Sequence, residues 1–201
     1  MVAVKNDYLK LTPKEYFSWE EHQLERHEYV DGKANVMTSG TVNHSIVSVK
    51  FAALLSSHLR GDNYIILGCD CLINIVKSND YTYPDVSVTC DNRDKTTTQY
   101  ITYPCLLIEV LSKSTEAYDR GGKFRMYRQN PILEDYVLVS SEKIEIDLYH
   151  KTESGSWEII NYQVGDTIEL KSVNLTFPLA KPLGTRIEQI YEGITFTQEA
   201  V

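Results

Sequence analysis

The chain has 201 residues, of which 42% are hydrophobic and 24% are charged, and its formal net charge is −8. This composition is that of an ordinary globular protein, and the length suits one domain, which we expect to span residues 1–201. The acidic balance argues against a protein that coats nucleic acid through non-specific phosphate contacts, because such proteins are usually basic. No apolar run follows Met1 and no segment is long enough to span a bilayer, so we expect a cytoplasmic protein without a signal peptide or a membrane partner.

The first two predicted elements carry start and turn signals. Thr12 is followed by a proline and, three residues after it, by Glu15, which is the pattern of a capped helix with proline at its first position. This helix is expected to end before the next segment, 28–37. That segment predicts two short strands around the Asp31-Gly32 turn, because Asp-Gly is a favoured hairpin dipeptide.

A second helix is expected over residues 42–59, where apolar residues recur at helical spacing before Gly61. Residues 64–76 are rich in β-branched side chains and predict a strand. Cys69 and Cys71 fall in this segment, and their one-residue spacing is not that of a zinc knuckle. We interpret the four cysteines of the chain as small buried hydrophobes with reduced thiols.

The rest of the chain alternates between strand and helix patterns. A short strand is expected over 85–89 and an apolar strand over 106–111, followed by a helix over 114–129 that Asn130-Pro131 closes. Further short strands are expected at 136–140, 144–149, 157–162 and 168–170, and a short helix at 185–191. This order favours an α/β sheet with helices packed on it over a sandwich.

Two acids occupy unusual positions in these strands. Asp85 opens a strand of valine and serine, and Glu109 lies within six otherwise apolar residues. Because an unpaired carboxylate on a buried strand is costly, each needs a cation, hydrogen-bond donors or a metal ion as its partner. Acids at the ends of adjacent strands can converge on one Mg²⁺, which prefers oxygen ligands. An exposed strand edge or a structural ion pair is the alternative for both.

Basic residues gather in the segment that follows Glu109. Residues 109–130 contain five Lys or Arg against three Asp or Glu, a local balance of +2 in an acidic chain. Lys123 is the base that we expect to serve the two acids, with a solvated helix face as the alternative. Gly121-Gly122 is unfavourable inside a helix, so either the regular helix begins after it or something, such as a phosphate backbone, packs closely there.

Several short motifs follow one another in a fixed order. They are Tyr-Pro-Asp-Val-Ser-Val at 83–88, Leu-Ile-Glu-Val-Leu-Ser-Lys-Ser-Thr at 107–115, the stretch 119–127 with Gly-Lys-Phe inside it, Glu-Asp-Tyr at 134–136, the Glu-Tyr-Val-Asp-Gly turn at 28–32, and His44. This ordered set resembles the Uma-two family of restriction-endonuclease-like nucleases, and the resemblance covers nearly the whole chain. It implies a restriction-endonuclease-like α/β fold, in which helices flank a mixed central sheet that carries both acidic strands side by side.

The family is similar to the PD-(D/E)xK nucleases, whose core places an Asp and an acid-x-Lys motif on neighbouring strands. Asp85 and Glu109 fill the acidic positions, but the lysine position two residues after Glu109 holds Leu111, which is usual in this family. The resemblance therefore implies that Lys123, from the following helix, supplies the catalytic cation. It also implies that Asp85, Glu109 and the backbone carbonyl of Val110 hold Mg²⁺ or Mn²⁺.

Two further residues of the matching motifs have open roles. Glu28 is expected as an outer metal ligand or a water holder. His44 contacts a phosphate in one interpretation, and in the preferred one it caps or packs the second helix. Lys123 is expected at the edge of a buried seam formed by Phe124 and Tyr127, with its ammonium in a cleft, so that replacing it costs little stability.

Together these residues predict a metal-dependent DNA endonuclease that hydrolyses phosphodiester bonds, with DNA as its partner and a homodimer as an allowed assembly. Leu111 in the lysine position leaves a second hypothesis open, namely a non-catalytic nuclease-like domain used for binding or assembly. A small-molecule hydrolase is disfavoured, because the sequence lacks a Gly-x-Ser-x-Gly elbow, a P-loop and a dinucleotide fingerprint.

Overall fold

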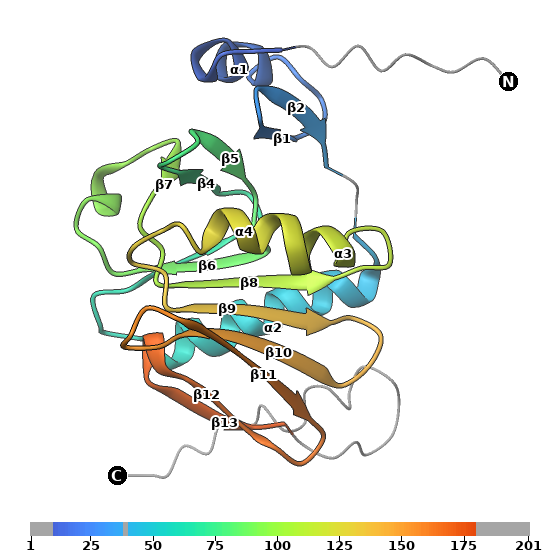
Figure 1. Cartoon of the computed structure of the whole chain (residues 1–201), viewed down its shortest axis with the longest axis vertical. Helices are drawn as coiled ribbons and strands as arrows, with labels where there is room; N and C mark the ends of the chain where they lie inside the picture. The colour runs from blue at the N-terminus through green and yellow to red at the C-terminus, as the bar shows by residue number, and fades with distance from the viewer. Residues whose placement is uncertain (1–9, 38–39, 180–201) are drawn as a thin grey trace, which may run out of the picture.

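The computed structural model describes residues 10–37 and 40–179, which form two mixed β-sheets with helices packed on them (Figure 1). The six-stranded sheet, in the order β11-β10-β9-β8-β6-β3, contains β3 (Ile65–Gly68), β6 (Val86–Thr89), β8 (Leu106–Leu111), β9 (Asp135–Ser140), β10 (Glu145–Lys151) and β11 (Trp157–Gln163). The five-stranded sheet, in the order β2-β1-β5-β4-β7, contains β1 (His27–Val30), β2 (Lys33–Val36), β4 (Leu72–Ile75), β5 (Asp80–Thr82) and β7 (Tyr100–Ile101). A separate hairpin pairs β12 (Thr167–Leu170) with β13 (Leu175–Pro178).

The helical elements are α1 (Pro13–Glu20), α2 (Val42–His58), the 3₁₀ turn η1 (Asp94–Thr96), α3 (Glu116–Tyr118), the π-helical turn η2 (Asp119–Lys123), α4 (Phe124–Tyr127) and the 3₁₀ turn η3 (Lys171–Val173). Among the helices that the structure describes, none is long and apolar enough to cross a membrane. The helix predicted at 185–191 lies outside the described residues. The predicted α/β fold, with a mixed sheet flanked by helices, is confirmed.

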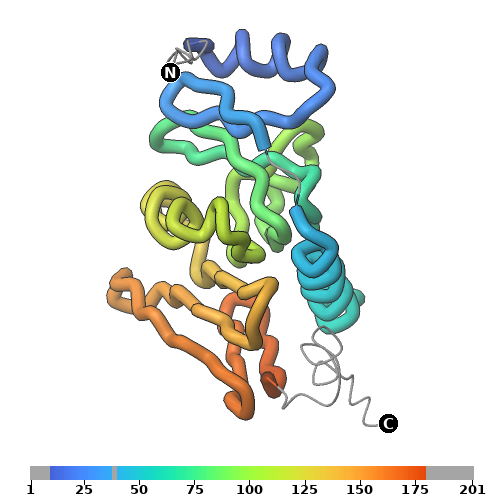
Figure 2. The backbone as a smooth tube through the Cα atoms, turned by 90° about the vertical axis from the view of Figure 1, so that its right-hand side faces the viewer, coloured from blue at the N-terminus to red at the C-terminus, as the bar shows by residue number. Residues whose placement is uncertain are grey.

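Strand β8 lies at the centre of the six-stranded sheet, and its side chains point alternately to the two faces of that sheet. It pairs antiparallel with β6 and parallel with β9, so the two acidic strands are neighbours as predicted. Ile108 and Val110 belong to the core that α2 covers, whereas Leu107 and Leu111 belong to the core that α4 covers. Figure 2 shows α2 on one side of the sheet and the α3–α4 segment on the other. Because successive strand residues point to opposite faces, Glu109 must point toward the α4 side.

The local signals at the N-terminal end are confirmed. The side chain of Thr12 accepts a hydrogen bond from the backbone N–H of Glu15, whose carboxylate accepts one from the N–H of Thr12, as a capping box requires. Asp31 and Gly32 both have positive φ, 52° and 78°, at the turn between β1 and β2. Two positive φ angles are the signature of the tight hairpin turn that an Asp-Gly pair favours.

The single strand predicted over 64–76 is wrong. The segment forms β3 and β4, which belong to different sheets and are separated by a turn at residues 69–71. The β-branched composition identified both strands, but it could not show that the chain leaves one sheet for the other. This crossing joins the two sheets.

The interpretation of the cysteines as buried hydrophobes is correct only for Cys105. Cys69 is exposed, and Cys71 and Cys90 are partly buried. Cys69 and Cys71 lie in the turn between β3 and β4 rather than on a strand, so they do not share a sheet face. All four thiols are free.

Leu111 is a core residue of the face that α4 covers. It packs in the same cluster as Tyr127, Leu133 and Leu138, and only 5% of its surface is exposed. We expect Leu111→Ala to lower the free energy of unfolding by about 2–5 kcal/mol, the usual range for deleting a buried leucine side chain. Urea denaturation measures this loss, and a loss below about 1 kcal/mol would mean that the position is not part of the packed core.

Candidate active site

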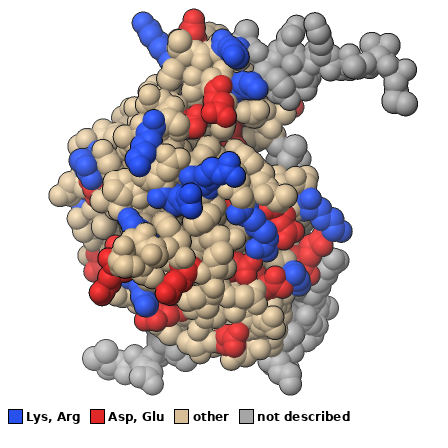
Figure 3. Space-filling model, viewed as in Figure 1, with Lys and Arg blue, Asp and Glu red and all other residues tan. Residues whose placement is uncertain are grey.

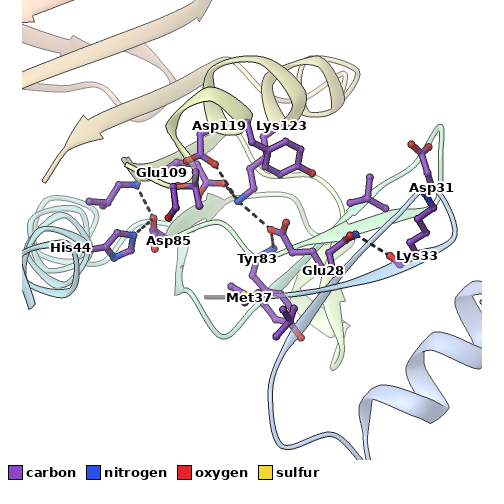
Figure 4. Close-up of a pocket in the computed structure, with 17 residues that line it drawn as sticks. Glu28, Asp31, Lys33, Met37, His44, Tyr83, Asp85, Glu109, Asp119 and Lys123 are labelled. Atoms are coloured by element: carbon purple, nitrogen blue, oxygen red, sulfur yellow. Dashed lines mark hydrogen bonds and ion pairs between the residues drawn. The ribbon is translucent and has the colours of Figure 1, made fainter. Parts of the chain in front are cut away.

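A cavity of about 520 Å³ lies where the two sheets meet (Figure 4). The β1–β2 hairpin forms one wall, and the other walls come from α2, the segment before β6, the end of β8, and the α3–η2 turn. All the residues that the sequence nominated for the site, Glu28, Asp85, Glu109, Val110 and Lys123, line this cavity. They converge from four separate segments of the chain, since Glu109 and Val110 are neighbours on β8.

The register of β6 and β8 brings the two nominated acids together. Val86 lies opposite Ile108, so one further step along this antiparallel ladder sets Asp85 opposite Glu109. Directly opposed residues share a face of the sheet, which here is the face covered by η2 and α4. Burial raises the pKa of Glu109 well above its ordinary value of 4.5, Lys123 opposes this rise, and the nearby Asp85 carboxylate adds to it.

Asp85 is held at the cavity by the backbone of β8 and by α2. Its Oδ2 accepts a hydrogen bond of 2.7 Å from the N–H of Val110 and lies 3.3 Å from Nε2 of His44. The N–H and carbonyl of one strand residue point to the same edge, so the Val110 carbonyl also faces this end of β6. The hydrogen bond to Asp85 raises the pKa of His44 above 6.5, and a backbone hydrogen bond with Val110 contributes.

One part of the preferred expectation for His44, that it caps α2, is wrong. Thr41 caps this helix, because its Oγ1 accepts a hydrogen bond from the backbone N–H of His44. The imidazole instead points into the cavity toward Asp85, as Figure 4 shows. An imidazole three residues past a threonine cap lies in the first turn of α2, at the end that faces the site.

Lys123 lies in a cage of three acids. Its Nζ is 3.0 Å from Oε1 of Glu109, 3.1 Å from Oε1 of Glu28 and 3.7 Å from Oδ1 of Asp119. Burial acts to lower its pKa, but the three carboxylates raise it well above 10.5, so the ammonium stays charged. Only 7% of the residue is exposed. The ammonium lies in a cleft as expected, because Lys123 lines the cavity. It is buried there among three acids, which argues against the expectation that replacing it costs little stability.

Glu28 ties β1 to the segment between β5 and β6 and to η2 at this site. It lies on β1, and its Oε1 accepts a hydrogen bond of 3.1 Å from the backbone N–H of Tyr83, two residues before Asp85. The same oxygen makes the ion pair with Lys123. Glu28 therefore helps to fix the position of the ammonium, and its role as an outer metal ligand or water holder stays a prediction.

Tyr127 and Asp119 are site residues that sequence reasoning missed. The hydroxyl of Tyr127 donates to Oε1 of Glu109 at 3.0 Å, and it also makes a 3.0 Å hydrogen bond with Thr82 Oγ1. Asp119 Oδ1 is buried without a hydrogen-bond partner among the described residues, although it lies 3.7 Å from Lys123 Nζ. The i, i+4 spacing of Asp119 and Lys123 was a signal that could have identified this pair.

The regular helix predicted over 114–129 is wrong in its middle. Residues 119–123 form a π-helical turn between two short α-helices. Gly122 packs against a ring of its own segment, because a Cβ there would lie 2.5 Å from Cδ2 of Tyr118. The close packing expected at the glycine pair therefore involves Tyr118. A π-turn shifts the following side chains around the helix, which places Lys123 toward Glu109.

Acidic groups outnumber basic groups at this site. Glu28, Glu109 and Asp119 are buried and Asp85 is partly buried, whereas Lys123 is the one buried ammonium that they face among the described residues. Burial raises the pKa values of Glu109 and Asp119, so the excess acid favours proton uptake. A divalent cation would satisfy the same excess without protons.

The donor set fits a hard cation that keeps part of its water shell. Within the described residues, no group of three or more His, Cys, Asp or Glu side chains is arranged to hold a metal ion. Mg²⁺ usually binds through one or two carboxylates together with water and substrate phosphates, and does not need a closed protein cage. Asp85 and Glu109, with the carbonyl of Val110 at the same edge, supply that type of partial ligand set.

Comparison with known proteins assigns this chain to a family. A family model named Uma2, described as "Putative restriction endonuclease", matches residues 13–180. The chain belongs to the Uma2 family. The matched range includes every residue of the cavity discussed above.

Two relatives of this Uma2 protein come from Synechocystis sp. One, "Uncharacterized protein slr1290", is 54% identical over 187 residues, covering 93% of this chain and 94% of the relative. The other, "Uncharacterized protein sll1609", is 29% identical over 163 residues, covering 80% and 92%. A crystal structure from Anabaena variabilis, described as "a putative nuclease belonging to DUF820", covers 92% of this chain and 99% of its own with a TM-score of 0.68. At 13% identity this likeness shows a shared fold.

Proposed function

We propose that this Uma2 protein is a divalent-metal-dependent DNA endonuclease that hydrolyses phosphodiester bonds. The observation that carries the proposal is the excess of carboxyl groups over cations at the cavity, where Asp85 and Glu109 face each other from neighbouring strands. Buried acids without matching cations are costly, and a hard divalent ion offsets that cost. The family and the fold support the same conclusion.

Asp85, Glu109 and the carbonyl of Val110 would hold Mg²⁺ or Mn²⁺. When bound, the ion would lower the pKa of a coordinated water and neutralise charge on the phosphate. The protein contributes the placement of its ligands: Val110 N–H and His44 hold Asp85, and Tyr127 holds Glu109. Such outer contacts fix the orientation of the ligands and commonly affect metal affinity 10–100-fold.

Lys123 supplies the fixed positive charge that Leu111 cannot. Its ammonium lies 3.0 Å from the carboxylate of Glu109. In the general motif, a lysine on the strand itself, two residues after the acid, would supply this positive charge. Beside Glu109, Lys123 orients the attacking water or stabilises the charge that develops on the phosphate. Glu28 and Asp119 position the ammonium from two sides.

The alternative function, a non-catalytic binding or assembly module, rested on the missing lysine at position 111. The position of Lys123 weakens that reason, because the acid pair has a lysine partner from another element. The buried, partly unsatisfied acids are also unfavourable in a purely structural domain, since apolar residues would be more stable there. These observations favour the enzyme over the module.

Supercoiled plasmid DNA tests the proposal directly. We expect nicking in Mg²⁺ or Mn²⁺ that EDTA stops, because the chemistry depends on the ion at Asp85 and Glu109. Absence of nicking with either metal, in a folded preparation across linear, supercoiled and single-stranded DNA, would favour the module.

Metal binding can be measured apart from catalysis by thermal denaturation. We expect Mn²⁺ to raise the melting temperature, since an ion at 100 times its Kd stabilises the folded state by about 2.7 kcal/mol. The pKa values of Glu109 and Asp119 are raised, so protons compete with the ion, and the shift should shrink as the pH falls. A shift that is independent of pH, or unchanged in Asp85→Asn, would place the ion elsewhere.

A further inference from the structure

A second cavity, of about 560 Å³, opens beyond the C-terminal end of α4 and is lined by basic side chains. We name it the basic groove and define it by Lys77, Arg93, Arg128 and Lys151, with Tyr103 between them. None of the described residues that line it is an Asp or Glu. Four cations on one surface are unexpected in a chain with a net charge of −8, and like charges repel unless an anion joins them.

Arg93 is held in a fixed orientation in this groove. Its guanidinium lies 3.4 Å from the centre of the Tyr103 ring. The carboxylate of Asp91 accepts hydrogen bonds from Nε of Arg93 at 2.8 Å and from Nη2 of Arg93 at 2.6 Å. Asp91 offsets the charge of Arg93, whereas Lys77, Arg128 and Lys151 have no ion pair with an Asp or Glu in the described part of the chain.

The wall that carries Arg93 and Tyr103 is fixed by a buried acid. Asp94 is 4% exposed, and its carboxylate accepts hydrogen bonds from Thr89 Oγ1 and from the backbone N–H groups of Thr102 and Tyr103, at 2.8–3.0 Å. A carboxylate with three donors is well satisfied inside a protein. The loop is therefore a rigid support for the groove.

The opposite wall is tied to the same loop. Asn130 is buried just after α4, and its Nδ2 donates to the carbonyl of Thr102 at 2.6 Å. Arg128, two residues earlier, is exposed, as is Lys77 on the turn between β4 and β5. Lys151 donates to the carbonyl of Pro131 at 2.9 Å, which uses one of the three hydrogens of its ammonium.

The groove is close to the candidate active site along the same helical segment. Arg128 is five residues after Lys123, which corresponds to about 7.5 Å of helical rise. Figure 3 shows basic side chains gathered across the middle of the face on which α4 lies. A polyanion lying along α4 from the active-site cavity would therefore meet this groove within roughly two or three nucleotides of strand length.

We propose that the basic groove binds the phosphate backbone of the nucleic acid that the active-site cavity cleaves. This inference rests on the proposed nuclease function and names the surface that anchors the substrate. The support is rigid and the charges are complementary: three cations have no ion pair, one guanidinium is held in a fixed orientation, and no carboxylate is among the described lining residues. Phosphate contacts of this kind position a nucleic acid without reading its sequence.

The test is binding of a fluorescently labelled 30-base-pair DNA duplex in EDTA, measured over a range of salt concentrations, with wild type and Lys77→Gln/Arg128→Gln. We expect the double variant to bind about 10-fold more weakly or worse. The slope of log affinity against log salt should fall by roughly two, one for each lost phosphate contact. Both side chains are exposed, so the melting temperature should not change.

The matched control is Lys14→Gln/Arg60→Gln, which removes the same two charges from exposed positions outside the groove. Equal weakening by both double variants, or an unchanged salt slope in Lys77→Gln/Arg128→Gln, would overturn the proposal. So would a wild-type protein that binds heparin but not duplex DNA. A wild type that binds through the groove but never cleaves would contradict the nuclease function and leave the groove standing. If wild type cleaves DNA and Lys77→Gln/Arg128→Gln binds and cleaves it equally well, the groove proposal fails and the nuclease function stands.

Discussion

Asp85→Asn and Glu109→Gln are each expected to lower metal-dependent cleavage by at least roughly 1,000-fold. An amide keeps the shape of the side chain but removes the charge that attracts the ion. The ion's stabilisation of the transition state is worth several kcal/mol, which corresponds to this factor in rate. Initial rates of plasmid nicking, at a temperature where both variants are folded, measure the effect.

Glu109→Gln should lose cleavage activity without losing stability. Burial raises the pKa of Glu109, which means that the charged form is disfavoured in the folded protein. A neutral amide removes that cost, while Lys123 keeps Glu28 and Asp119 as ion-pair partners. We expect the free energy of unfolding at pH 7 to stay within about 1 kcal/mol of wild type or to rise, as at many functional sites.

Glu134→Gln is the matched control for this pair of variants, because Glu134 is exposed and does not line the active-site cavity. Its cleavage rate should equal that of wild type. Full activity in Asp85→Asn or Glu109→Gln would remove that residue from the mechanism. A loss of activity that parallels a loss of melting temperature would mean that the acid serves the fold.

Lys123→Met is expected to lower both cleavage and stability. Losing one fixed electrostatic donor typically lowers the rate by about 100-fold or more. The stability cost should be about 3–5 kcal/mol at pH 7, because Glu28, Glu109 and Asp119 lose the ammonium that they share inside the protein. A lysine on a solvated helix face would cost almost nothing. Arg125→Met, at an exposed position on α4, is the matched control.

The stability loss in Lys123→Met should depend on pH. Without the ammonium, the pKa values of Glu109 and Asp119 should rise further, since the lysine now opposes the effect of burial. A raised pKa in the folded state means that the folded protein binds protons more readily than the unfolded chain. Stability is therefore recovered as the pH falls from the raised values toward the ordinary values of 4.5 and 3.8.

Denaturation of Lys123→Met and wild type at several pH values measures this recovery. Cleavage should remain low throughout, because protons restore neutrality but not the positive charge that faces the phosphate. A stability difference that is constant between pH 5 and pH 8 would contradict the shared cage of acids. Wild-type activity in Lys123→Met would move the catalytic cation to another residue.

Under the proposed function, the position of Lys123 accounts for a leucine in the lysine position of the motif. Leu111 and Glu109 are on the same face of β8, and α4 covers that face. The π-turn before α4 directs Lys123 from above the sheet onto Glu109, so the strand position is free to be apolar. The two variants should accordingly differ in their effects. Leu111→Ala should mainly lower the free energy of unfolding, whereas Lys123→Met should lower both the free energy of unfolding and the cleavage rate.

The sequence by itself determined the features that depend on neighbouring residues. The capping box at Thr12 and the turn at Asp31-Gly32 formed as expected, because their hydrogen bonds and φ angles involve residues within a few positions of one another. Asp85 and Glu109 were nominated correctly for the cavity, since an acid inside an apolar strand is conspicuous without any structure.

Only the tertiary structure decided which groups surround those acids. Glu28 meets the Tyr83 backbone across 55 positions of the chain, and Asp85 meets the Val110 N–H across 25. Composition likewise missed the change of sheet within 64–76, because both halves are equally rich in strand-forming residues. The burial of Lys123 depends on contacts with remote segments, such as its ion pair with Glu28 of β1, and a local pattern contains no information about which distant segment will cover it. Hydrophobic burial and ion pairing between remote segments are properties of the packed chain, and they determined the environment of the site.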